Sequence, residues 1–192
     1  MLEKLINTKR VCPRWLCFTF DNPLLKIIHD PIAILSPYVQ QGDTVIDIGP
    51  GMGYFTIPLA ELVGSKGSLI AIDIQQKMLS ALMARAHKKG LSDRIKTHLA
   101  GPDSIGFNEK ANFILAFWMM HEVPDQHRFL SEIRNLMKPE RLFLLVEPVI
   151  HVSKKNFTLA IETAKELGFV IKKSPKIRMS QSVLLSSSKD GH

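Results

Sequence analysis

The chain has 192 residues, of which 45% are apolar and 22% charged, and it carries a formal net charge of +7. These values are typical of one folded domain and exclude a disordered tail, a collagen-like fibre and a tandem of large domains. The longest uncharged apolar run, residues 113–120, is well short of the ~18 residues that a membrane span needs. The start of the chain lacks the pattern of a secretory signal. Because the two cysteines, Cys12 and Cys17, are too few for a disulfide framework, we expect a reduced cytoplasmic protein.

From about Gly42 the sequence alternates short β-like runs with amphipathic helical runs. Its first half predicts four strands, at residues 44–48, 69–73, 95–99 and 112–118. Two helices are predicted between them, at residues 54–63 and 75–89. Pro58 lies inside the first helix, and we expect it to distort the early turns.

The second half continues the alternation. A helix is predicted to begin after the N-cap residue Asp125 and to end before Pro139. Three further strands are predicted at residues 141–147, 169–173 and 183–186, and a helix is predicted at residues 155–167. This pattern predicts an α/β fold, a doubly wound, mostly parallel, seven-stranded Rossmann-like sheet with helices on both faces. Residues 1–41 differ in composition and are predicted as an N-terminal cap segment over the active site, ahead of a domain at 42–192.

A glycine loop follows the first strand and has the pattern D-x-G-x-G-x-G, formed by Asp47, Gly49, Gly51 and Gly53. Glycines allow positive φ angles and close approach of the backbone to a ligand, and the start of a helix offers free N–H groups. The dinucleotide-binding fingerprint G-x-G-x-x-G would need a glycine at position 54, where the chain has Tyr54. The loop therefore indicates a different ligand.

This pattern resembles motif I of the class I S-adenosylmethionine-dependent methyltransferases. Asp73 extends the resemblance to the end of the second strand. The segment LAFWMMHEVPD at 115–125 looks like the family's motif after strand four. The segment LMKPERLFLLVE at 136–147 is similar to its helix–turn–strand-five signature, with Glu140 and Arg141 in place of the usual pair of glycines. The resemblance covers about residues 40–150 and implies methyl transfer from S-adenosyl-L-methionine.

The resemblance also implies which residues bind this cofactor. The loop residues Gly49, Gly51 and Gly53, with Pro50 between them, would line its methionine part. Asp47 would hold the amino group, directly or through water.

Four more residues would contact the nucleoside part or close the site. Asp73 would hold the ribose, since an acid at this topological position accepts from both hydroxyls. Ile74 would pack on the adenine, and Phe117 would form a wall. Asp103 would lie near the adenine amino group, and a plain turn aspartate beside glycine and proline is an equally weighted alternative.

Methyl transfer needs a base only if the acceptor must lose a proton to become nucleophilic. His121 is the candidate catalytic base and Glu122 a second candidate, because both follow strand four at the carboxyl edge of the sheet. The alternatives are that His121 caps the loop or packs under a lid, and that Glu122 is a loop contact.

Several acceptor classes are disfavoured by what the sequence lacks. No D/N-P-P-Y/F follows strand four, and such a motif is typical of amide and exocyclic-amine methyltransferases. No cysteine follows strand four or five, which disfavours covalent cytosine-C5 chemistry. Cys12 and Cys17 form a poor version of an arsenite methyltransferase site and are predicted to be structural. Together with His29 they also lack the spacing of a zinc site, so no metal is predicted.

The predicted acceptor is a small, apolar or planar metabolite, because no large insertion provides a recognition domain. Its pocket would be roofed by residues 1–41 and the loops at 101–109 and 148–156. Apolar and aromatic side chains would line it: Trp15, Phe18, Phe20, Trp118, Met119 and Met120. These aromatics equally suit the burial of the N-terminal arm against the core.

Two alternatives stay open. From Pro148 onward the chain carries +5 of its net charge, and this stretch suits a solvated outer face or contact with RNA, acidic lipid or an acidic metabolite. An RNA acceptor held by it is the second prediction. The other is a cofactor-binding interaction subunit of the same fold that transfers no methyl group.

Overall fold

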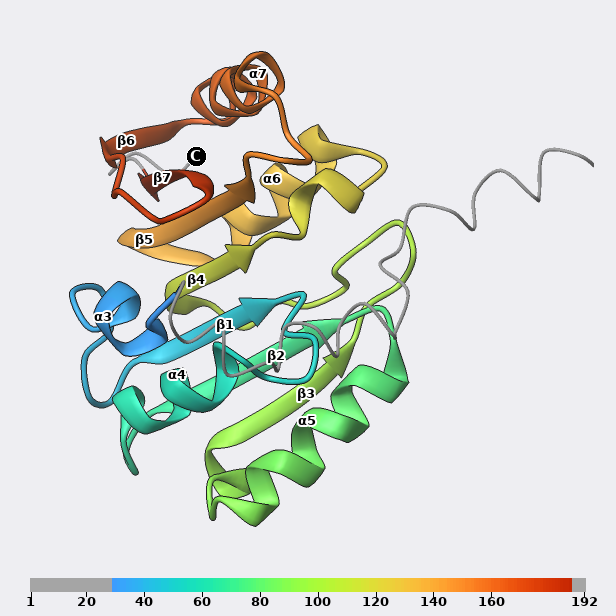
Figure 1. Ribbon diagram of the computed structural model, residues 1–192, viewed down its shortest axis with the longest axis vertical. Coiled ribbons are helices and arrows are strands. Elements are labelled where there is room, and N and C mark those ends of the chain that lie inside the picture. The colour runs from blue at the N-terminus through green and yellow to red at the C-terminus, as the bar shows by residue number, and fades with distance from the viewer. Residues whose placement is uncertain (1–28, 188–192) are drawn as a thin grey trace, which may run out of the picture.

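The computed structural model describes residues 29–187 of the chain. In this part seven strands form one sheet in the order β3-β2-β1-β4-β5-β7-β6 (Figure 1). The parallel strands are β1 (Thr44–Ile48), β2 (Ser68–Asp73), β3 (Ile95–Leu99), β4 (Ala111–Phe117) and β5 (Met137–Pro148). Strand β7 (Ser180–Ser187) runs antiparallel to both β5 and β6 (Phe169–Lys173). The predicted doubly wound, mostly parallel sheet is confirmed.

Helices cover both faces of the sheet. One face carries α3 (Pro31–Leu35), α4 (Thr56–Val63) and α5 (Gln76–Lys88), and the other carries α6 (Gln126–Leu136) and α7 (Lys154–Glu166). Short 3-10 turns, η4 (Ser92–Arg94) and η5 (Met120–Glu122), precede β3 and follow β4. Because both faces are covered, residues of the central strands β1, β2 and β4 are buried on both sides and these strands are apolar along most of their length, whereas the edge strands β3 and β6 are largely exposed.

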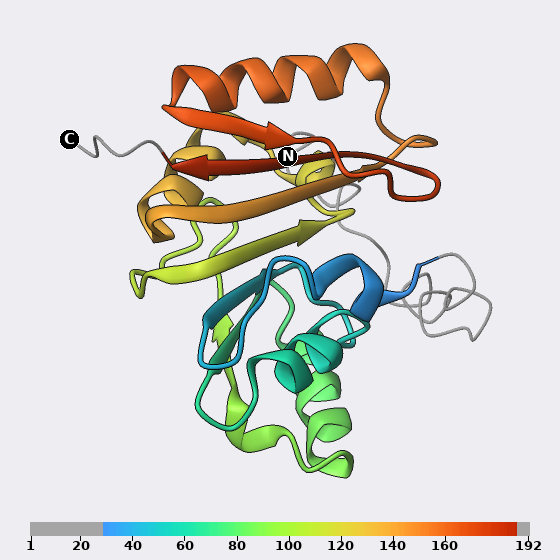
Figure 2. The same ribbon diagram turned by 90° about the vertical axis from the view of Figure 1, so that its left-hand side faces the viewer.

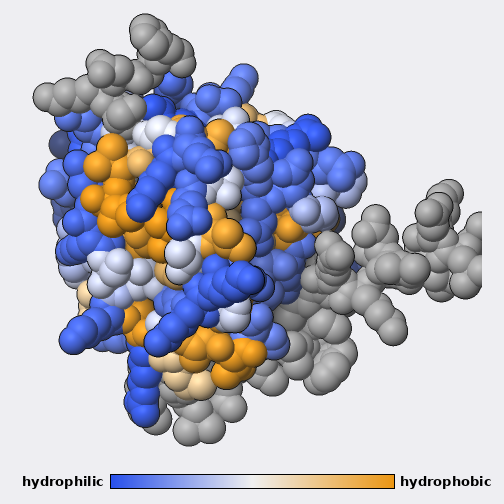
Figure 3. All heavy atoms as spheres, turned by 90° about the horizontal axis from the view of Figure 1, so that it is seen from above, coloured by the Kyte–Doolittle hydropathy of each residue, from blue (hydrophilic) through white to orange (hydrophobic). Residues whose placement is uncertain are grey.

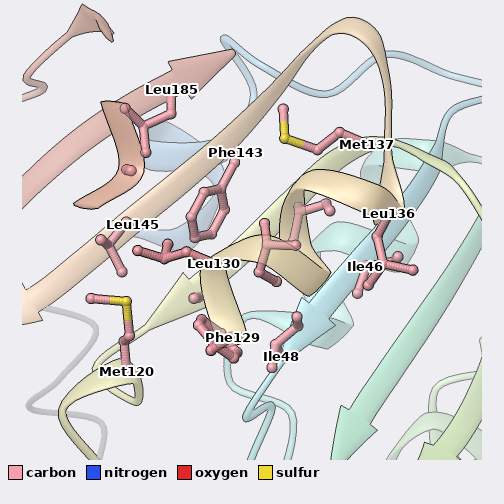
Figure 4. Packing of buried hydrophobic residues seen from close by; sticks show 14 of the residues in the cluster. Ile46, Ile48, Met120, Phe129, Leu130, Leu136, Met137, Phe143, Leu145 and Leu185 are labelled. Atoms are coloured by element: carbon pink, nitrogen blue, oxygen red, sulfur yellow. The ribbon is translucent and has the colours of Figure 1, made fainter. Parts of the chain in front are cut away.

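Two apolar layers result, one on each side of the sheet. In β1, Val45 packs in the layer of α3, α4 and α5, whereas Ile46 and Ile48 pack in the layer of α6 and α7. Figure 4 shows the second layer, where Leu130 of α6 lies beside Phe143 and Phe129 lies near Ile48. This core fixes the strand ends that carry the site.

Strand β1 has the predicted bounds, whereas helix α4 begins two residues later than predicted, ahead of Pro58. The helix begins at Thr56, so Pro58 lies in its first turn, where a backbone N–H has no partner within the helix. Leu59 N still donates to Phe55 O at 3.0 Å, and Ile57 N donates to Gly53 O at 3.2 Å. The predicted distortion by Pro58 is therefore wrong.

The strands β4, β5 and β7 also depart from prediction. Strand β4 ends at Phe117, because Trp118 has a φ of 58° and leaves the strand conformation. Strand β5 begins directly after α6 and has a register shift around Glu140. Glu140 has a φ of 58° and is one of the two residues that stand in place of the glycines of the resembled motif. Strand β7 is longer than residues 183–186, since its serines pair through the backbone with β5.

Most of the predicted cap, residues 1–41, lies outside the described residues, together with Cys12, Cys17, Trp15, Phe18 and Phe20. Its described part includes α3, which packs beside α4, and Asp30 caps α3 by accepting from Ile32 N and Ala33 N. The predicted cap of α6 is confirmed, since Asp125 accepts from Arg128 N at 2.9 Å. Within residues 29–187, none of the helices has the length and apolar character needed to cross a bilayer.

Candidate active site

The glycine loop after β1 lies at the carboxyl edge of the sheet. Gly49 N donates to Ile72 O at 2.9 Å, which ties the loop to β2. Gly49, Gly51 and Gly53 have positive φ angles of 70°, 54° and 90°, a conformation that other residues adopt at a cost. The first strand and its turn thus take the shape that the glycine pattern predicts.

The three glycines meet different surroundings. A Cβ atom on Gly49 would lie 2.9 Å from Cβ of Met119, and one on Gly53 would collide with Leu82. A Cβ atom on Gly51 would meet nothing within 4 Å. Gly49 and Gly53 therefore allow close packing within the protein, whereas Gly51 faces open space beside the loop.

Asp47 is a buried carboxylate at the start of this loop, only 2% exposed. It accepts a hydrogen bond from the hydroxyl of Thr56 at 2.6 Å. Burial raises the pKa of Asp47 to about 7, against the opposing effect of the Thr56 hydrogen bond, and the negative charge of Asp73 raises it further. A positively charged group next to Asp47 would reverse this shift.

Asp73 is the second buried carboxylate, at the end of β2. It accepts from Gln75 N at 2.8 Å. Burial raises its pKa to about 6, although backbone N–H groups of Gln75 and Gly51 favour the charged form. The backbone N–H of Gly51 thus lies against Asp73, and the charge of Asp73 acts on Asp47, so two buried carboxylates lie near the loop.

Two further predicted cofactor residues, Ile74 and Asp103, lie in different surroundings. Ile74 is 47% exposed directly after Asp73, so its side chain is available to a planar ligand. The loop after β3 returns to the same edge, because Ala100 N donates to Asp73 O at 3.0 Å. Asp103 lies in a turn closed by Gly101 N and Ser104 O at 3.0 Å, and its side chain is exposed. No contact among the described residues draws Asp103 toward Asp73, so its role stays a prediction.

Phe117 ends β4 in a cluster of rings. Its ring centroid is 4.1 Å from that of Phe55 and 5.6 Å from that of Trp118. His29 packs edge-on against both Phe117 and Trp118, at 5.2 and 5.1 Å, and its Nε2 is 2.8 Å from Arg178 O. Burial lowers the pKa of His29 in this position. The described end of the cap segment is thus fastened at the carboxyl edge by His29.

The three residues after β4 that are predicted to line the acceptor pocket differ in burial. Trp118 and Met119 are partly buried, whereas Met120 is 2% exposed and packs in the core layer of α6, as Figure 4 shows. The 3-10 turn directs Met120 inward under the sheet edge, so the prediction that it lines an acceptor pocket is wrong.

His121 is held by a buried carboxylate that sequence reasoning missed. Its Nδ1 lies 2.6 Å from Oε2 of Glu147, the last but one residue of β5. Glu147 is 1% exposed and also accepts from Met120 N at 2.9 Å, so its position is fixed. The ring of His151 stacks on that of His121 at 5.7 Å. The structure brings together an oriented imidazole and a second histidine from the loop after β5.

The charges around His121 favour its protonated form. Burial alone lowers the pKa of His121, but the hydrogen bond and charge of Glu147, together with the charge of Glu122, raise it above the ordinary value. The charge of Glu122 also raises the pKa of Asp73. Glu122 therefore lies near enough to both Asp73 and His121 for its charge to act on each of them.

A family model described as a methyltransferase domain matches residues 40–183. A demethylmenaquinone methyltransferase of Lactobacillus johnsonii is 28% identical over 138 residues, 68% of this chain and 57% of that protein. A ubiquinone/menaquinone biosynthesis C-methyltransferase of Brucella canis is 30% identical over 118 residues, 60% of this chain and 44% of that protein. The chain spans about half the length of these curated relatives.

Solved structures share the fold. A SAM-dependent methyltransferase from Aquifex aeolicus superposes with a TM-score of 0.82 at 21% identity, over 92% of this chain and 99% of that chain. A SAM-dependent O-methyltransferase from Thermotoga maritima superposes with a TM-score of 0.68 at 21% identity, over 85% of this chain and 66% of that chain. At these identities the similarity concerns the arrangement of strands and helices.

Proposed function

Since this chain belongs to the class I S-adenosylmethionine-dependent methyltransferases, we propose that it transfers the methyl group of this cofactor to a small, apolar or planar metabolite. The observation that carries the proposal is the juxtaposition at one sheet edge of two buried carboxylates around Gly51 with the His121–Glu147 pair. One side of the site suits the cofactor and the other suits an acceptor that must lose a proton.

The residues around Gly51 fit the cofactor. The space beside Gly51 is open, since a Cβ there would meet nothing within 4 Å, and the methionine part of the bound cofactor would fill it. Asp73 would accept from the ribose hydroxyls, and exposed Ile74 would cover one face of the adenine. Asp47 would meet the cationic amino group, directly or through water. The positive charge of that group would lower the raised pKa of Asp47 toward its ordinary value.

The bound cofactor supplies an electrophilic methyl group, so the protein has to position the acceptor and remove a proton where the acceptor carries one. His121 is the proposed base. Glu147 holds the Nδ1 side of the ring, which leaves Nε2 as the nitrogen that takes the proton. A base of this kind suits a hydroxyl on an aromatic ring or an activated ring carbon.

The two curated relatives support a quinone-like acceptor, because their names assign them to demethylmenaquinone and to ubiquinone and menaquinone biosynthesis. Asp103 and Phe117 are proposed at the adenine and at the wall of the site, as in the sequence prediction. A cytoplasmic location is proposed with this function.

The proposal is tested by calorimetric titration with S-adenosylmethionine and its demethylated product, followed by transfer of labelled methyl to reduced demethylmenaquinone, small phenols and bulk RNA. Binding with transfer to the ring compounds supports it. Transfer to RNA alone would favour the second prediction, and binding without transfer to any of them would favour a non-catalytic subunit. Absence of binding to either cofactor form would refute the assignment of the loop.

A further inference from the structure

Beyond the site, the same end of the molecule carries exposed aliphatic side chains. Three large apolar side chains are exposed to water there: Ile150 (69% exposed), Val149 (49%) and Met179 (45%). Val149 N donates to Met179 O at 3.1 Å, so the loop after β5 and the turn before β7 form one continuous surface. We refer to Val149, Ile150 and Met179 with the cations around them as the rim surface.

The cations of the rim surface come from both of its loops. Lys154 and Lys155 open α7, and Lys176 and Arg178 lie in the turn between β6 and β7, all four with exposed side chains. The segments 148–161 and 167–187 contain six lysines and arginines and neither aspartate nor glutamate. The rim surface therefore combines uncompensated positive charge with exposed aliphatic groups.

The figures place these segments together. Figure 2 shows the loop after β5, the β6–β7 turn and the start of α7 at the same end of the sheet. Seen from the side of α7 and β6, the molecule shows apolar areas interrupted by hydrophilic side chains (Figure 3). Exposed groups of this size in a contiguous area mark an interaction site.

We propose that the rim surface docks this protein on a bilayer that contains anionic phospholipids. Lysine and arginine near such a bilayer are attracted by its negative surface potential, and aliphatic side chains enter the boundary between headgroups and acyl chains. Both components are present here on two loops that are tied to each other. The proposal concerns membrane contact and does not depend on methyl transfer.

RNA is a less suitable occupant of this surface. Sequence-tolerant RNA binding stacks bases on aromatic side chains beside the cations. The exposed loops at 148–153 and 174–179 contain no Phe, Tyr or Trp, and they present aliphatic chains instead. Exposed isoleucine and valine gain from an acyl environment and contribute little to a phosphate backbone.

The position of the rim surface connects the bilayer with the site. Val149 follows Pro148 at the carboxyl end of β5, next to Glu147, and His151 of the same loop stacks on His121. A docked membrane would therefore face the acceptor side of the site. An apolar acceptor dissolved in that membrane would reach His121 with little exposure to water.

The test is vesicle partitioning of the full chain, with vesicles of phosphatidylcholine containing phosphatidylglycerol and with phosphatidylcholine alone. We expect binding to the anionic vesicles that weakens with salt. Ile150→Glu should lower the partition coefficient about tenfold or more, because it places a charge where an apolar chain enters the boundary. Val170→Glu is the matched control, since Val170 is 44% exposed near the start of β6, at the opposite end of that strand, and it should change binding less than about twofold.

A second pair of variants tests the cations. Neutralising Lys154 and Arg178 together, as K154Q with R178Q, should weaken partitioning by about 25-fold, roughly fivefold for each charge. K66Q with K88Q removes the same charge from exposed positions near the other edge and should have little effect. Circular dichroism of each variant checks that it is folded.

Three results would overturn the proposal. The first is absence of binding of the wild-type chain to anionic vesicles. The second is equal partitioning of Ile150→Glu and Val170→Glu. The third is equal binding of wild type and Ile150→Glu to an RNA homopolymer, together with vesicle binding that depends on the lysines and arginines but is unchanged by Ile150→Glu.

Discussion

Replacing Asp47 with asparagine should stabilise the protein without cofactor at alkaline pH while abolishing cofactor binding. Asp47 is fully buried, and its one hydrogen bond, from Thr56, does not offset the loss of hydration. Its pKa of about 7 in the native state compares with 3.8 for the free side chain. Between these values the native carboxyl binds a proton that the unfolded one has lost.

The sign of the pH effect follows from this difference. Unfolding releases the proton of Asp47 between about pH 4 and pH 7, so the stability contributed by this group falls as pH rises through that range and is lowest above pH 7. With about 1.4 kcal/mol for each unit, the charged form costs on the order of 4 kcal/mol at pH 8. In a chain of this size such a change corresponds to roughly 10 °C in the melting temperature.

Thermal unfolding of Asp47→Asn and wild type at pH 5 and pH 8 measures this difference. The variant keeps an acceptor for the Thr56 hydroxyl and removes the charge, so it should melt higher at pH 8 and by a smaller margin at pH 5, where the same difference in pKa costs only about 2 kcal/mol. Asp93→Asn, at an exposed position, is the control and should show no such dependence. S-adenosylmethionine should raise the melting temperature of wild type and leave Asp47→Asn unchanged. A variant that melts lower than wild type at pH 8 would refute the reasoning.

Three further predictions concern the same edge. Asp73→Ala should weaken S-adenosylmethionine binding in calorimetry while the circular dichroism spectrum is kept, and unchanged affinity would mean that the ribose lies elsewhere. Gly51→Ala should fold but lose cofactor affinity, since its Cβ enters open space. Gly53→Ala should lower the free energy of unfolding by about 2 kcal/mol or more, through the clash with Leu82 and its φ of 90°. A larger loss of stability in Gly51→Ala than in Gly53→Ala would contradict the packing. Glu147→Gln should reduce the methyl-transfer rate on the order of tenfold and lower the pKa of His121, so the fall of activity on acidification should move to lower pH than in wild type; a pH–rate profile unmoved by the substitution would exclude His121 as the base.

Much of the fold follows from local sequence patterns, because buried parallel strands are continuous apolar runs separated by glycine turns. Strands β3 and β6 begin and end where predicted. Strand β7 was underestimated, since its serines carry no apolar signal and its extent is decided by backbone pairing with β5. Strand β5 begins at Met137, four residues before the predicted start, because Met137 pairs with Ala111 ahead of the left-handed Glu140, and no sequence pattern marks a non-glycine residue for that conformation.

The candidate site could be predicted on the cofactor side and less on the acceptor side. Asp47 and Asp73 are marked by their spacing to glycines and strand ends. Glu147 was missed, although a signal existed, because it is an acid at the carboxyl end of an apolar strand, as Asp73 is. The packing of His29 on Phe117 joins positions far apart in the chain, and no local pattern predicts such a contact.

The left-handed backbone of Trp118 has a consequence for how the site is assembled. A non-glycine residue in this conformation costs about 1–3 kcal/mol, so surrounding contacts must impose it. They come from two other strands, since Trp118 N donates to Val146 O at 2.8 Å and its indole donates to Ser180 Oγ at 2.9 Å. The loop that carries His121 therefore takes its shape only once β7, the last strand among residues 29–187, has joined the sheet. Asp47, the three glycines and Asp73 lie on β1, β2 and the loop between them, whereas the acceptor side depends on the contacts that β5 and β7 make with Trp118.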